Sequence, residues 1–350
     1  MVDVDGQFLS CVCFLCVNEP DKSGVVAPVP TATGFFVGVP LGSTPPARID
    51  YVVTARHCIE EARARGKNTI YIRFNRKTGD FIEVATSVDD WLAHDTADVA
   101  AIPVSPDALP GGLASKDVDA ASLSMSAFVG PGPHYEWEGE IPGYGKKVIR
   151  FVVGHEIYLT GLFTEHYGKE RNLPIARFGH ISRMPGTVEI ESAGGRAEIT
   201  AYLAEFQSWG GQSGSPVFFW HPMMAETELT DSGGKTIRTM YDLIHATAFM
   251  GLVHGHYDIR STQKTKDVGD LQLKLNSGIA IVTPAEAVKQ LLMREDLVED
   301  REKIRKDFES SGPTPTPDSG GGDEGLTRPE FEETLKKVSR RVRPSRRDKA

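Results

Sequence analysis

The chain lacks any apolar run of the about 18 residues that a membrane-spanning helix needs, which excludes an integral membrane protein of the helical kind. It is also poor in cysteine, with four in 350 residues: Cys11, Cys13, Cys16 and Cys58. A secreted domain that relied on disulfides would space its cysteines to close long loops, whereas three of these crowd into six residues. We therefore expect free thiols and a reducing compartment.

The first residues are acidic, Met1-Val-Asp-Val-Asp, where a signal peptide needs a basic segment. The apolar run 8–17 fits either the core of a signal peptide or a buried first strand, and we favour the strand. A cytoplasmic location follows as the expectation. The spacing Cys11-x-Cys13-x-x-Cys16 would also suit zinc, but there is no second pair of ligands, so core packing is preferred.

Outside one end of the chain, acidic residues outnumber basic ones overall. The net charge is −9, which makes general nucleic-acid coating unlikely, so no nucleic-acid partner is expected. Residues 336–350, however, hold eight Lys or Arg and one Asp.

What the chain does contain is many short β-type runs separated by Gly, Pro, Asp and Asn, from residue 8 to about 282. A segment rich in Pro, Gly and Ser, 103–145, divides them into an early and a late set. We predict an all-β fold of two packed antiparallel β-barrels. The predicted parts are one domain over 1–295, with barrels at about 8–104 and 148–282 and a closing helix at 284–293.

The β pattern stops at Thr283-Pro-Ala-Glu286, which predicts a capping box with Thr283 as the N-cap and Pro284 as the first helical residue. A charged helical extension is expected over 296–309, and a flexible linker over 310–328. Residues 329–350 combine a short amphipathic pattern with the basic end. They fit either a docking helix for a protein partner or a solvated tail.

Three segments carry possible chemistry: Thr54-Ala-Arg-His57-Cys58, Asp98-Val-Ala-Ala-Ile102 and Gly211-Gln-Ser213-Gly-Ser-Pro216. Together they resemble the signature segments of trypsin-like (chymotrypsin-fold) serine proteases. The resemblance extends to 33–37 and 251–254, and Gly278-Ile-Ala-Ile-Val-Thr-Pro284 is similar to the closing strand and helix of bacterial Deg-type members. It covers about residues 8–295 and suggests a cytosolic bacterial type.

The resemblance implies a serine endopeptidase acting on proteins or peptides through an acyl-enzyme, without a cofactor. It assigns Ser213 as nucleophile, His57 as general base and acid, and Asp98 as the group that orients the imidazole. The backbone N–H groups of Gly211 and Ser213 would form the oxyanion hole. Since no accessory module is evident, an effector that cuts one partner protein is a further possibility.

Several alternatives stay open. Asp95 and Asp90 compete with Asp98, although Asp98 alone directly precedes the apolar run, and Ser215 competes with Ser213. The chain could also be an inactive fold of this type that binds peptide segments.

The resemblance places substrate contacts at Gln207, His254, Gly255 and His256. Gln207 stands where trypsin has an aspartate, so a strict preference for Lys or Arg does not follow. The last three residues match the strand that pairs with the substrate backbone. His254 and His256 could instead bind a metal as residues i and i+2 of a strand, but no metal site is expected.

The family pattern is not matched everywhere. Cys58 lacks the partner that secreted relatives have, and Gln212 replaces the aspartate that captures a new N-terminus in zymogen-type members. Activation by N-terminal cleavage is therefore doubtful. Residues 164–172 are interpreted as an added loop.

Overall fold

The structure is a computed structural model that describes residues 6–20, 24–43, 47–104, 118–130, 136–141, 145–192, 195–206, 210–230, 236–265 and 269–310. Strands dominate these residues, and two helices follow the last strand. The predicted all-β class with a C-terminal helix is confirmed. The predicted linker and basic tail, from 311 onward, lie outside the described residues.

The first half of the chain forms an eight-stranded sheet in the order β5-β4-β1-β2-β3-β7-β6, with β8 added in parallel to β2. Its strands are β1 (Val12–Pro20), β2 (Val26–Pro40), β3 (Arg48–Thr54), β4 (Thr69–Asn75), β5 (Phe81–Ser87), β6 (Leu92–Ala93), β7 (Ala100–Pro103) and β8 (Leu123–Ser124). In the described residues the end strands β5 and β6 do not pair with each other, so this half is an open, curved sheet.

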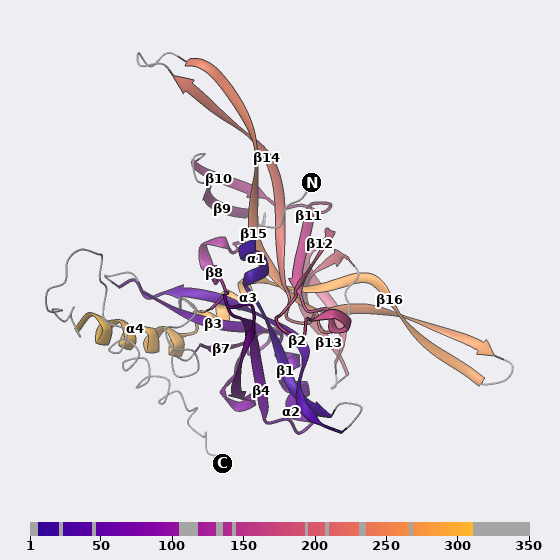
Figure 1. Ribbon diagram of the computed structural model, residues 1–350. Helices are drawn as coiled ribbons and strands as arrows, with labels where there is room; N and C mark the ends of the chain where they lie inside the picture. Colours follow the sequence, from indigo (N-terminus) through magenta and orange to yellow (C-terminus); the bar gives the residue numbers. More distant parts are fainter. Residues whose placement is uncertain are drawn as a thin grey trace.

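The second half is a closed six-stranded barrel in the order β11-β12-β13-β16-β15-β14. Its strands are β11 (Glu156–Gly161), β12 (Ile175–Ser192), β13 (Gly195–Glu205), β14 (Pro216–Thr230), β15 (Thr236–Thr265) and β16 (Gly269–Pro284). The hairpins β14–β15 and β15–β16 continue far beyond the barrel as two long arms (Figure 1).

A separate hairpin precedes the barrel. It pairs β9 (Glu136–Ile141) with β10 (Gly145–Arg150), so the strand expected near Val148 belongs to this two-stranded sheet. The helices are short apart from the last. They are α1 (Gly6–Ser10), α2 (Arg56–Ala64), α3 (Ala285–Leu292) and α4 (Glu295–Ser310), with 3-10 turns at Val88–Asp90, Met125–Ala127 and Thr164–His166.

Neighbouring side chains in the strands alternate between two cores, as the twofold repeat of a strand requires. Phe36 packs inside the first sheet, while Phe35 faces the opposite way into a core shared by both halves. In the barrel, Phe219 points to the interior and Phe218 joins Phe35 in the shared core. The shared core also takes in α3 and Ile304 of α4, so one apolar cluster holds the sheet, the barrel and the C-terminal helices together.

Two local predictions were wrong. Residues 8–10 belong to α1, because Cys11 N–H donates to the Gln7 carbonyl in a helical turn, and the strand begins only at Val12. Helix α3 has Pro284 as its N-cap and no capping box. Thr283 still lies in β16, and its buried hydroxyl has no hydrogen-bond partner among the described residues.

The segment 164–172 packs against the first sheet. Arg73 of β4 donates hydrogen bonds to the carbonyls of Gly168 (2.8 Å) and Lys169 (3.2 Å), and the buried Asn172 donates to the Arg73 carbonyl. The segment therefore ties the two halves together. No described helix is long and apolar enough to span a membrane.

The three N-terminal cysteines are completely buried and free, and they face different cores: Cys11 and Cys16 face the shared core, while Cys13 faces the first sheet. Burial raises the pKa of Cys11 and Cys13 well above the usual thiol range and that of Cys16 to about 12. Since the thiolate is the reactive form, these side chains are inert core residues.

We expect iodoacetamide to alkylate only Cys58, which is partly exposed, in the native protein near pH 8. Mass spectrometry after tryptic digestion measures each site. In denaturant all four thiols should react at similar rates, which provides the control. Native labelling of Cys11, Cys13 or Cys16 as fast as Cys58 would contradict their burial.

Candidate functional site

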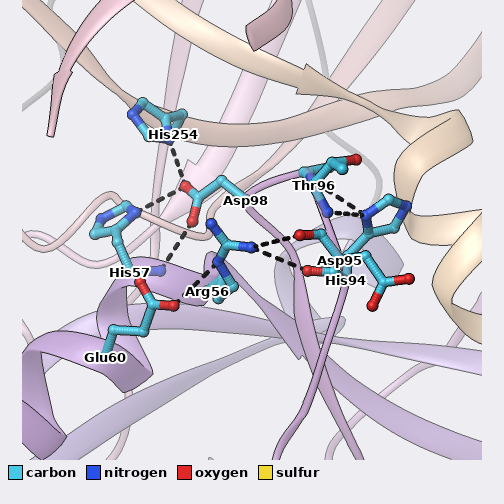
Figure 2. A network of polar contacts seen from close by, with 9 residues as sticks. Arg56, His57, Glu60, His94, Asp95, Thr96, Asp98 and His254 are labelled. Carbon is cyan, nitrogen blue, oxygen red and sulfur yellow. Dashed lines mark hydrogen bonds and ion pairs between the residues drawn. The ribbon is translucent and has the colours of Figure 1, made fainter. Parts of the chain in front are cut away.

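His57 follows closely after β3 of the first sheet and lies at the junction of the two halves. The buried end of β3 leads through Ala55 into α2, where His57 is the second helical residue. Ala55 is the N-cap and has no side chain to satisfy the free N–H groups of the first turn. The Asp98 carboxylate does this instead: its Oδ1 accepts the His57 backbone N–H at 2.8 Å (Figure 2).

Asp98 is presented by a turn between β6 and β7 that makes its own polar contacts. The ring Nδ1 of His94 accepts the backbone N–H groups of Thr96 (3.1 Å) and Ala97 (3.0 Å). From α2, the Arg56 guanidinium donates to the carbonyl of His94 at 3.0 Å. Figure 2 shows this network between the turn and the helix. The helix that carries the imidazole and the turn that carries the carboxylate are thus fastened to each other.

Two imidazoles converge on one carboxylate oxygen. Nδ1 of His57 lies 2.7 Å from Asp98 Oδ2, and Nδ1 of His254 lies 2.5 Å from the same oxygen. Asp98 is 7% exposed, and the side chains of His57 and His254 are 25% and 17% exposed. The two rings meet edge to face with their centroids 5.2 Å apart.

Burial and the neighbouring charges together set the protonation of Asp98 and of His57. Burial alone would raise the pKa of Asp98, but the hydrogen bonds and charges of His254 and His57 hold it far below the usual carboxyl range. Burial opposes the charged form of His57, yet the Cys58 sulfur and the Asp98 carboxylate outweigh it and raise the pKa of His57 well above its usual range. The resting site therefore favours an imidazolium beside a carboxylate.

Ser213 lies on a glycine turn that leads into β14. Its carbonyl accepts the Thr33 N–H at 3.0 Å, and the next amide, Gly214 N–H, donates to the Val253 carbonyl at 2.8 Å. Gly214 has a φ of +82°, and a Cβ there would lie 2.2 Å from the Thr33 carbonyl oxygen and 2.3 Å from Thr54 Oγ1. The turn is thus seated on the strand ends just before His57.

The hydrogen bond from serine to histidine that completes a catalytic triad is absent among the described residues. Ser213 Oγ donates to the His254 carbonyl at 3.3 Å, and no hydrogen bond joins it to the His57 ring. The other ring nitrogen, His57 Nε2, lies 3.7 Å from Cys58 Sγ. The Ser213 hydroxyl is therefore hydrogen-bonded to His254, the residue that shares Asp98 with His57, and not to the His57 ring.

The backbone N–H groups of Gly211 and Ser213 donate to no described residue. Gly211 has a φ of +89°, and its carbonyl is held by the Thr33 hydroxyl at 2.9 Å. A Cβ at Gly211 would approach Thr164 and Leu162 to less than 3 Å. Within the described part of the chain, neither of these two amides next to the Ser213 side chain has an acceptor.

The remaining predicted residues are placed as follows. Gln207 lies outside the described residues. Gly255 and His256 lie on β15, where they pair with Ile281 and Ala280 of β16. Ser215, the rival of Ser213, is fully buried and its hydroxyl has no partner in the described part of the chain.

Sequence reasoning missed one role. It predicted His254 as a substrate contact, which stays a prediction, and did not foresee that the ring is the second donor to Asp98. Spacing could not have indicated this, since 156 residues separate the two and both lie in unremarkable local patterns. Among the described residues, His57, Asp98 and His254 also form the one group of potential metal ligands, with their three donor atoms within 4.8 Å of one another.

We expect Gly214→Ala to lower the free energy of unfolding by about 2 kcal/mol or more, because the new Cβ would collide with Thr33 and Thr54 at a strained φ. Chemical denaturation measures this change. Gly210→Ala is the matched control, since a Cβ there meets nothing within 4 Å. Equal effects of the two substitutions would contradict the described seating of the turn.

A scan against protein-family models gave no match, and neither did a search of curated protein sequences. Solved structures are similar to this chain, among them a protease domain and a serine protease. The protease domain of MamO from Magnetospirillum magneticum is 14% identical with a TM-score of 0.41, covering 82% of this chain and 98% of that one. The thermostable serine protease AL20 from an extremophilic microorganism is 10% identical with a TM-score of 0.36, covering 81% and 95%. At such low TM-scores the likeness carries no information about activity or substrate.

Proposed function

We propose that the chain is a serine endopeptidase that hydrolyses peptide bonds of protein substrates through an acyl-enzyme. The observation that carries the proposal is the tethered imidazole: Asp98 holds both the backbone and the ring of His57, beside a serine on a glycine turn. An imidazole fixed in this way has a defined tautomer, with its proton at Nδ1 and Nε2 available as a base.

In the proposed reaction Ser213 Oγ attacks the scissile carbonyl carbon while its proton passes to His57 Nε2. The oxygen of the tetrahedral intermediate would be bound by the N–H groups of Gly211 and Ser213. Such a donor typically contributes about 3–4 kcal/mol. The C–N bond then breaks as His57 gives the proton to the leaving amine. Water repeats the sequence on the ester and restores the serine.

The resting geometry sets two requirements. The Ser213 side chain has to turn from the His254 carbonyl toward His57 Nε2. In addition, His57 has to lose the proton that its surroundings favour before it can accept one from the serine. Both changes are side-chain events that leave the backbone of the turn in place. Because its surroundings raise the pKa of His57 to about 11, activity assays should extend from pH 7 to about 11.

A place for the substrate backbone adjoins Ser213. In the described residues β15 pairs with β14 as far as Leu252, and beyond it Gly255 and His256 pair with Ile281 and Ala280 of β16. The serine turn lies beside the start of this stretch, because Ser213 Oγ donates to the His254 carbonyl. An extended peptide could pair there by strand addition, which supports a protein substrate.

The test is covalent labelling with a fluorophosphonate, followed by cleavage of a peptide library. We expect Ser213→Ala to abolish labelling and to lower kcat by about 10⁴-fold or more. Ser215→Ala is the matched control, because it removes a buried hydroxyl that has no described partner and should leave labelling intact. Labelling that persists in Ser213→Ala and disappears in Ser215→Ala would assign the nucleophile to the neighbouring serine.

A second candidate function is a catalytically silent fold that binds peptide segments along β15. It is favoured by one observation: the Ser213 hydroxyl contacts the His254 carbonyl and not the His57 ring. Folded protein that resists the fluorophosphonate from pH 7 to about 11, where His57 loses its proton, yet binds peptides from the same library, would support this candidate over the hydrolase.

A further inference from the structure

The carboxylate at the centre of the site is shared by two histidines from different halves of the chain. His57 approaches Asp98 Oδ2 from α2, and His254 approaches it from β15, each through Nδ1. A proteolytic site needs only one of these imidazoles as its base. The second imidazole adds a nitrogen ligand that proton transfer to and from Ser213 does not require.

We propose that His57, Asp98 and His254 form a binding site for Zn²⁺ or a similar divalent transition metal, and that the bound metal blocks hydrolysis. The inhibitory half rests on the proposed endopeptidase function, whereas metal binding does not. Two imidazole nitrogens with one carboxylate oxygen are a ligand set that zinc accepts, and they leave a fourth position for water.

The carboxylate is oriented for this role. Asp98 Oδ1 is occupied by the His57 backbone N–H at 2.8 Å, which leaves Oδ2 pointing between the two imidazoles. In metal centres, the orientation of a ligand is usually held by hydrogen bonds to those of its atoms that do not bind the metal. Arg56 adds to this support, because it fastens the turn that carries Asp98 to α2.

The separations require a small rearrangement. The present distances of 2.7 and 2.5 Å are those of hydrogen bonds. With bonds of about 2.1 Å to a tetrahedral zinc, neighbouring ligand atoms lie about 3.4 Å apart, so each ring has to recede by about 1 Å. His254 lies at an irregularity of the sheet, since the β15–β16 register shifts between Val253 and Gly255.

Coordination and catalysis would exclude each other. To bind through Nδ1, each imidazole has to give up the proton that it shares with Asp98, and water takes up that proton. His57 would then have its Nδ1 lone pair on the metal and could no longer be oriented by the carboxylate. The base that Ser213 needs would be lost while the metal stays bound.

The experiment uses the full chain freed of metal with EDTA and then titrated with ZnCl₂ by isothermal calorimetry. We expect one zinc per chain and loss of fluorophosphonate labelling at the same zinc concentration, with recovery after EDTA. His254→Ser should weaken zinc binding about 100-fold or more, because a neutral hydroxyl binds zinc poorly, and His254→Asn should do the same while its amide N–H, placed like Nδ1, can still donate to Asp98. Circular dichroism checks that both variants fold.

His155→Ser is the matched control. His155 and His221 are also neighbours, with ring centroids 5.5 Å apart, but they lie outside the cluster. Zinc binding should persist in this variant, and its loss here but not in His254→Ser would overturn the proposal. Absence of zinc binding in the unchanged chain would overturn it as well, while labelling of Ser213 in zinc-free buffer would still establish the hydrolase. Zinc binding without any labelling would leave the metal site standing and remove the proposed enzyme.

Discussion

A buried carboxylate has to be satisfied by hydrogen-bond donors, and in this protein the donors to Asp98 come from both halves of the chain. The backbone and ring of His57 arrive from the first sheet, and the ring of His254 arrives from the closed barrel. Removing one partner of a buried ion pair typically costs about 3–5 kcal/mol, because the other charge is left unpaired. The geometry of the site is therefore coupled to the way in which the sheet and the barrel meet.

Apolar packing between the sheet and the barrel also couples the geometry of the site to the way in which the two halves meet. Phe35 of the sheet lies against Phe249 of the barrel, with ring centroids 5.1 Å apart, inside the core that both halves share. Thr33, two residues before it, binds the serine turn twice: its hydroxyl donates to the Gly211 carbonyl and its N–H to the Ser213 carbonyl. The turn that carries the proposed nucleophile is thus part of the junction, and neither half alone could assemble the site.

The two proposals for this site differ in what occupies the space around Asp98 Oδ2. When only hydrogen bonds to the two imidazoles lie there, His57 has a defined tautomer and can act as the base for Ser213. A metal ion there would use the same nitrogen atoms as ligands and remove the base. His254 is the residue that separates the two possibilities, since it is a proton donor to Asp98 in one state and a ligand in the other.

Strand periodicity was enough to predict the all-β class and the burial of the N-terminal cysteines, and the resemblance of the signature segments pointed to Asp98, in preference to Asp95 or Asp90, as the partner of His57. These follow from strand periodicity and from signature segments whose spacing is local. Three features became evident only from the three-dimensional structure: the first sheet stays open, α3 begins one residue later than its capping pattern predicts, and His254 turns onto Asp98. The same holds for Ser213, which faces a carbonyl at rest. Each of these depends on side-chain rotamers and on contacts between segments more than a hundred residues apart, or on competition for a single backbone N–H, and no local pattern of residues encodes them.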